Sequence, residues 1–178
     1  WTKLRIKERQ VFLLTNRHLF FYGFLATVFL MLYVLYAQYV LGLEPCPLCI
    51  LQRIAVIFLG MIFLCMTLLP PKTTATKLTA SIFFITFSLA GLGVAGRHVW
   101  LQHLPPDQIP GCGGDLTYMI SNFPLLEVFG MVFSGSGECA EINWSFLSLS
   151  MPAWALICFV LFALYGTWAI YQTKYNGY

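Results

Sequence analysis

Four long apolar runs, separated by shorter polar segments, dominate the chain of 178 residues. The runs cover about residues 19–41, 50–69, 78–100 and 153–171. A helix needs about 20 mostly apolar residues, at about 1.5 Å each, to cross a bilayer. Because backbone groups find no water to bond in lipid, each run is predicted to be helical. The pattern therefore predicts an all-α membrane protein, built as a bundle of four transmembrane helices.

Composition supports a membrane protein. The chain is 59% hydrophobic and 10% charged, whereas soluble domains carry about 25% charged residues. The first run has a basic lead-in, as a cleaved signal peptide would, but its apolar part exceeds the roughly 7–15 residues of such a segment. We therefore expect a retained helix and a single membrane domain over residues 1–178.

Basic residues gather on one side of the predicted spans. Outside the runs they are Lys3, Arg5, Lys7, Arg9, Arg17, Lys72, Lys77 and Lys174. The segments at about 42–49 and 101–151 contain no Lys or Arg. Since basic residues near span ends stay cytoplasmic, both termini are predicted to be cytoplasmic and these two segments to face outward. The net charge of +3 then reflects topology, and no nucleic-acid partner is expected.

The six cysteines fall into two groups. Cys65 and Cys158 each stand alone inside an apolar run, where a thiol packs as a small hydrophobe. The other four lie in the segments predicted to face outward, where disulfides are permitted. They are Cys46, Cys49, Cys112 and Cys139.

Three interpretations of these four cysteines compete. A structural Cys112–Cys139 disulfide would stabilise the long outer segment by about 3 kcal/mol, but closing the two-residue gap between Cys46 and Cys49 restrains almost nothing. A zinc site would use Cys-x-x-Cys as a half-site, but no second Cys-x-x-Cys or His-x-x-x-His completes it. We therefore expect no metal. The third interpretation is exchange of electron pairs between two dithiol/disulfide couples.

The sequence around the first pair favours exchange. Pro45 and Pro47 flank Cys46 and fix the turn. Cys49 falls near the first turn of the second predicted helix, where free N–H groups and the helix dipole favour a thiolate. Arg53 follows one turn later on the same face. A snorkelling arginine is one interpretation; the other is a cation that stabilises the Cys49 thiolate and an acceptor's reduced oxygen.

The electron acceptor is predicted to be a quinone. The thiol pair lies at the membrane edge, and the sequence has neither a Gly-x-Gly-x-x-Gly that follows a strand nor a Cys-x-x-Cys-His. A lipid-soluble two-electron carrier is then the economical acceptor. Ubiquinone and menaquinone present similar carbonyls, and the sequence does not choose between them.

These residues resemble the DsbB family, the bacterial inner-membrane proteins that form disulfides. The matching features are Cys46-Pro47-Leu48-Cys49 with Arg53, Cys112 in the outer segment, and "SGSGECAEINWSFLSLSMPAWAL" around Cys139. The likeness runs from the first predicted helix to the fourth. The resemblance implies a four-helix bundle with a long periplasmic loop between the third and fourth helices.

The resemblance also implies a relay. A reduced, periplasmic DsbA-like protein would attack the Cys112–Cys139 disulfide, with Cys112 forming the mixed bond. Cys139 would then exchange with Cys46. Cys49 would be left as the thiolate that donates to quinone, with help from Arg53.

Other positions match the family less closely. His98, near the outer end of the third predicted helix, is implied as a quinone-proximal residue, although its spacing to Cys112 is off by about one residue. Its alternative is a helix-end histidine bonded to water or backbone, and His103 is a lesser candidate. Gln52 stands where the family has an acidic residue, and Pro47 is unusual between the two thiols. Both changes could shift the redox poise of the first pair.

Two alternative functions remain open at this point. Vitamin K epoxide reductase-like proteins share the chemistry, but there the loop pair precedes the Cys-x-x-Cys, whereas here it follows. A non-enzymatic four-span scaffold with a disulfide-tied outer loop, similar in outline to a tetraspanin, would need neither Arg53 nor an exchange-prone Cys46–Cys49 pair.

Overall fold

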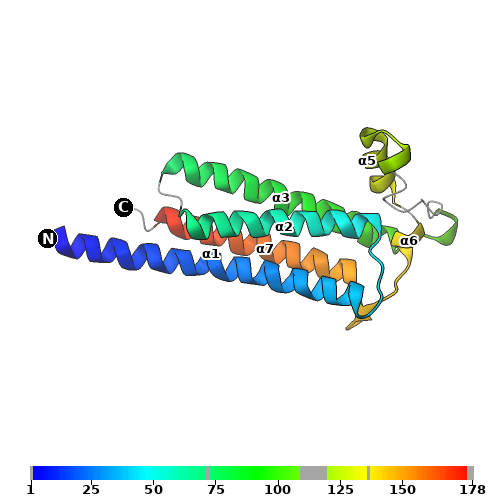
Figure 1. Ribbon diagram of the computed structural model, residues 1–178, viewed down its shortest axis with the longest axis horizontal. Coiled ribbons are helices and arrows are strands. Elements are labelled where there is room, and N and C mark those ends of the chain that lie inside the picture. Colours follow the sequence, from blue (N-terminus) through cyan, green and yellow to red (C-terminus); the bar gives the residue numbers. More distant parts are fainter. Residues whose placement is uncertain (1, 71–72, 109–119, 136, 176–178) are drawn as a thin grey trace.

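Four long helices lie side by side along the longest axis of the molecule (Figure 1). The structure is a computed structural model that describes residues 2–70, 73–108, 120–135 and 137–175. The helices are α1 (Thr2–Tyr39), α2 (Pro47–Leu68), α3 (Thr74–Leu101) and α7 (Met151–Tyr175). Each contains a stretch of 22 to 28 residues that is long and apolar enough to cross a membrane. The predicted four-helix membrane bundle is confirmed.

Local chemistry sets the helix boundaries. Pro47 occupies the first turn of α2, where its missing N–H costs nothing, so α2 begins three residues before the predicted run. Thr73 caps α3 through a capping box, in which its side chain accepts from Thr76 N at 3.2 Å. After α1 ends at Tyr39, Gly42 adopts a φ of +67° that turns the chain toward α2.

Phenylalanine rings facing glycines bring α3 and α7 close together. Phe159 of α7 lies against Gly91 of α3, and Phe84 of α3 lies against Gly166 of α7. All of these rings are buried, at 0–1% exposure. Helices gain little from excluding lipid, so close van der Waals packing over small residues holds the bundle together.

Substitution of Gly91 by alanine is expected to destabilise the bundle. A Cβ at this position would clash with the Phe159 ring, and overpacking of this kind costs about 1–3 kcal/mol. The matched control is Gly93→Ala on the same helix, where an added Cβ meets nothing within 4 Å. Thermal unfolding in detergent should show a lower melting temperature for Gly91→Ala alone. Equal behaviour of the two variants would contradict this packing.

The segment between α3 and α7 carries several short elements at one end of the bundle (Figure 1). They are η1 (Pro106–Gln108), α5 (Leu125–Ser134), α6 (Gly137–Ala140), β1 (Ser145–Phe146) and β2 (Leu149–Ser150). The two strands pair antiparallel, with Phe146 opposite Leu149. The apolar stretch after Pro124 forms the helix α5, which begins directly after this proline. Cys112 lies outside the described residues.

Candidate active site

The Cys-x-x-Cys pair is built into the start of α2. Cys46 is the N-cap residue, with extended backbone angles, and Cys49 lies in the first helical turn. The Cys46 thiol donates a hydrogen bond to the Cys49 Sγ at 3.0 Å. Cys46 is buried and Cys49 is half-buried. The predicted position of Cys49 in the first turn of this helix is confirmed.

The outer segment brings a third cysteine to this pair. Cys139 lies on α6 and is fully buried. Its Sγ, the Cys46 Sγ and a ring nitrogen of His98 all lie within 4.8 Å of one another. Apolar side chains from α2, α3 and α5 surround the group: Leu48, Leu101, Val128 and Val132. The structure therefore places Cys139 beside Cys46, although 92 positions separate them in the sequence.

Arg97 of α3 fixes the segment that carries Cys139. Its guanidinium donates to the backbone carbonyls of Phe133 and Ser134, at 3.2 and 3.0 Å, where α5 ends. It also lies 5.0 Å from the centre of the Trp100 ring. A cation at a helix C-terminus complements the helix dipole. Arg97 thereby ties α5, and the short α6 that follows it, to the outer end of α3.

His98 contacts the Cys46 thiol. Its ring is 2% exposed, with Nε2 3.7 Å from the Cys46 Sγ and Nδ1 3.2 Å from the Gln52 side-chain nitrogen. With the amide assigned in this way, Gln52 donates to Nδ1, and Nε2 carries the proton that points at Cys46. The side chain of His103, one turn further on, bonds the Val99 carbonyl and is exposed.

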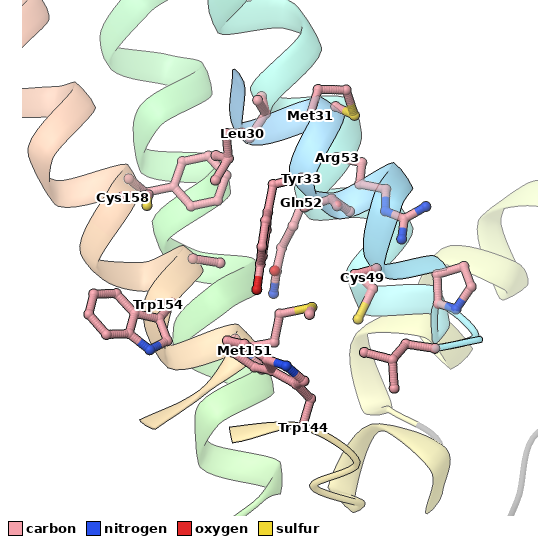
Figure 2. A pocket seen from close by; sticks show the side chains of 18 of the residues that line it. Leu30, Met31, Tyr33, Cys49, Gln52, Arg53, Trp144, Met151, Trp154 and Cys158 are labelled. Atoms are coloured by element: carbon pink, nitrogen blue, oxygen red, sulfur yellow. The ribbon is translucent and has the colours of Figure 1, made fainter. Parts of the chain in front are cut away.

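A cavity of about 550 Å³ opens on the other side of the Cys-x-x-Cys pair. It lies between α1, α2, α7 and the strand β1, and Figure 2 shows Cys49, Gln52 and Arg53 on α2 among the residues that line it. Aliphatic, aromatic and thioether side chains make up most of the wall, among them Met31, Val56, Met151, Phe159 and Phe162. A volume of this size suits a small organic molecule.

Aromatic rings cover the end of this cavity next to β1 and β2. Tyr33 of α1 meets the edge of Trp144 at 6.3 Å between ring centres, and Trp144 stacks on Phe146 at 6.2 Å. Trp154 of α7 holds the hairpin in place by donating its indole N–H to the Phe146 carbonyl at 3.1 Å. Planar side chains thus face the cavity from three different elements (Figure 2).

Arg53 presents spare hydrogen-bonding capacity at this cavity. Its NH1 group donates to the side-chain carbonyl of Gln38 on α1. Its Nε is buried and has no hydrogen-bond partner among the described residues. A buried donor without a partner is costly. Gln38 therefore anchors the guanidinium through NH1, and the remaining N–H groups of Arg53 can donate to a further acceptor.

Comparison with known protein families identifies the family of this chain. A sequence profile of the family described as "Disulfide bond formation protein DsbB" matches residues 16–169. The chain belongs to the DsbB family. Curated relatives named "Disulfide bond formation protein B" include those of Nitrosococcus oceani, 46% identical over 90% of this chain and 94% of the relative, and of Hahella chejuensis, 48% identical over 88% and 93%. The relative in Acinetobacter baumannii is 46% identical over 83% of this chain and 86% of its own length.

Membership of the DsbB family makes this chain a multi-pass membrane protein and a protein-disulfide oxidoreductase. The resemblance noted from the sequence is confirmed, and the scaffold and vitamin K epoxide reductase-like alternatives are set aside. Three residues of the DsbB site were not expected to act there from the sequence. Gln38 and Arg97 make their contacts across helices, which no local motif signals, and Gln52 was noted only as a departure from the family pattern.

Proposed function

We propose that this DsbB-family protein oxidises the dithiol of a periplasmic DsbA-like partner and delivers the two electrons to a membrane quinone. One observation carries the proposal: the Cys46–Cys49 pair joins two sites. Cys46 lies beside Cys139 of the outer segment, and Cys49 lines the apolar cavity together with Arg53. Electrons that enter at Cys139 therefore have a route through neighbouring thiols to the cavity.

The residues of the cavity fit a quinone. Apolar and aromatic walls suit the ring and an isoprenoid tail, and the guanidinium of Arg53, a lining residue, can donate to a carbonyl oxygen. When bound, a quinone takes up the two electrons and two protons released as the Cys46–Cys49 disulfide re-forms. Ubiquinone and menaquinone both offer the carbonyl that Arg53 would bind.

The thiols act in a fixed order. The partner's thiolate attacks the Cys112–Cys139 disulfide at Cys112, and a second partner thiol releases the partner as a disulfide, which leaves Cys112 and Cys139 reduced. Cys139 then attacks Cys46 of the Cys46–Cys49 disulfide, and Cys112 resolves that bond. His98, at 3.7 Å from the Cys46 Sγ, supplies a proton to the leaving Cys46 thiolate.

The proposal places these thiols on the periplasmic side of the inner membrane. The described cysteines of the relay, on α6 and at the start of α2, lie at one end of the bundle, and the start of α1 and the end of α7 lie at the other (Figure 1). Arg17, which bonds the Thr67 carbonyl near the end of α2, and Lys77, in the first turn of α3, lie at this second end, which the positive-inside rule assigns to the cytoplasm.

A direct assay tests the proposal. Purified protein in detergent, given a reduced DsbA-like partner and short-chain ubiquinone or menaquinone, should form one quinol for each partner disulfide. The matched control omits the protein, and a second control supplies partner that is already oxidised. Partner oxidation without quinol formation would contradict a quinone as the acceptor, and quinol formation without partner oxidation would contradict the relay.

A further inference from the structure

The protein holds three buried soft-metal donors at a single point, on the side of α2 away from the cavity. Cys46 caps α2, His98 belongs to the last turns of α3, and Cys139 lies on α6. Their exposed fractions are 8%, 2% and 0%. The two Sγ atoms and a ring nitrogen of His98 lie within 4.8 Å of one another. The sequence-based expectation of no metal rested on the lack of a completing motif, and folding brings the missing donor from another helix.

The spacing of these donors suits a small tetrahedral ion. Zinc binds sulfur at about 2.3 Å and imidazole nitrogen at about 2.0 Å, which sets two tetrahedral ligand atoms about 3.6 Å apart. The Cys46 Sγ lies 3.7 Å from His98 Nε2. Cys49, whose Sγ is 3.0 Å from the Cys46 Sγ, is the nearest further thiol. Rotation of side chains closes the remaining gap to Cys139.

The surroundings resemble those of a metal ligand set. A metal-bound histidine usually has its second ring nitrogen held by a neighbouring polar group, which fixes the ring and its tautomer. Gln52, buried at 7% exposure, contacts His98 Nδ1 at 3.2 Å. If the Gln52 amide turns over, its oxygen accepts from Nδ1–H, and Nε2 is then free to bind an ion. Apolar side chains around the group exclude competing water ligands.

We propose that the reduced protein binds one thiophilic divalent ion of the zinc class through Cys46, Cys139 and His98, and that this ion arrests the thiol relay. Binding converts two thiols and one imidazole into two metal–sulfur bonds and one metal–nitrogen bond, and it releases two protons. No electrons move. A disulfide sulfur is not such a ligand, so the oxidised protein does not form the site. The binding stands independently of the proposed function, whereas the arrest rests on it.

The thiol relay stops because the ion binds the two sulfur atoms that must react with each other. Cys46 and Cys139 are the two sulfurs that must exchange with each other. A thiolate that is bound to the ion and shielded from an approaching disulfide cannot attack that disulfide. The ion therefore competes with re-oxidation, and a chelator restores turnover. The site would make disulfide formation sensitive to free zinc-class ions on the outer side of the membrane.

Binding is tested on the full-length protein in detergent, without quinone or partner. The protein is reduced with a phosphine, and Zn²⁺ binding is measured by equilibrium dialysis with metal analysis. We expect one ion per reduced chain and none at the same free Zn²⁺ concentration for the oxidised chain. X-ray absorption of the zinc-loaded wild type should show sulfur and imidazole scattering together. Equal binding by the oxidised chain, or a shell without imidazole, would overturn the proposal.

Matched variants locate the ion. His98→Ala and Cys139→Ala should each weaken Zn²⁺ binding at least tenfold, and Gln52→Leu should weaken it by about tenfold through the histidine. His103→Ala, an exposed histidine one turn further along, and Cys65→Ala, an exposed thiol of α2, should bind as the wild type does. Wild-type affinity in His98→Ala or Cys139→Ala would overturn the site, as would loss of binding in either control.

Discussion

Replacement of Cys49 by serine is expected to abolish quinone reduction. Among the described cysteines of the proposed relay, Cys49 is the one that lines the cavity, and a hydroxyl can neither form the Cys46–Cys49 disulfide nor give up the electron pair. Removal of a reacting nucleophile commonly costs more than about 1,000-fold in turnover, and we expect a loss of at least that size. The measurement is quinol formation by purified Cys49→Ser protein with reduced partner.

The same variant should reveal the exchange between Cys46 and Cys139. Without Cys49, the Cys46 thiolate can attack the Cys112–Cys139 disulfide at Cys139, which forms a Cys46–Cys139 bond and releases the Cys112 thiolate. Because Cys49 is not there to resolve this bond, it should accumulate. Peptide mapping under non-reducing conditions would detect it. Cys65→Ala, which removes an exposed thiol from the same helix, should retain full turnover and show no such bond. Wild-type turnover in Cys49→Ser would contradict the role of this thiol.

The bundle was predictable because its signals are local. Each apolar run exceeds the length needed to span a membrane, and Pro47 marks the start of α2 within the sequence itself. The exact pairing of helices was not predictable in the same way. The contacts of Phe159 with Gly91 and of Phe84 with Gly166 join residues far apart in the chain. No periodic pattern in the sequence predicts which ring packs against which glycine.

In the site, too, features within one helix were predictable from the sequence, and contacts between helices were not. Cys49 and Arg53 share one helix face at a four-residue spacing, so their joint presence at the cavity follows from helix geometry. His98 was implied as a quinone neighbour, yet among the described residues it is absent from the cavity lining and contacts Cys46 instead. The rotation of α3 against α2 decides that difference, and tertiary packing alone sets this rotation.

Replacement of Arg53 by methionine should lower kcat about 100-fold with a smaller change in the KM for quinone. A cation aimed at an oxygen that gains negative charge acts mainly in the transition state, and loss of one such donor costs about 100- to 1,000-fold. Methionine keeps the length and apolar stem of the side chain and removes the charge. Steady-state kinetics at varied quinone concentration separates kcat from KM.

Three further variants distinguish this role from a snorkelling arginine. Arg53→Lys should recover part of the lost kcat, because lysine restores the positive charge but not the planar guanidinium with its paired donors. Gln38→Leu should give a smaller loss than Arg53→Met, since it removes only the side chain that holds the guanidinium. Arg17→Met removes a basic residue that bonds the Thr67 carbonyl at the far end of α2, and kcat should not change. If Arg53 only anchors α2 at the membrane surface, Arg53→Met will lower the yield of folded protein and leave kcat per folded molecule intact, which would exclude a role in the electron transfer.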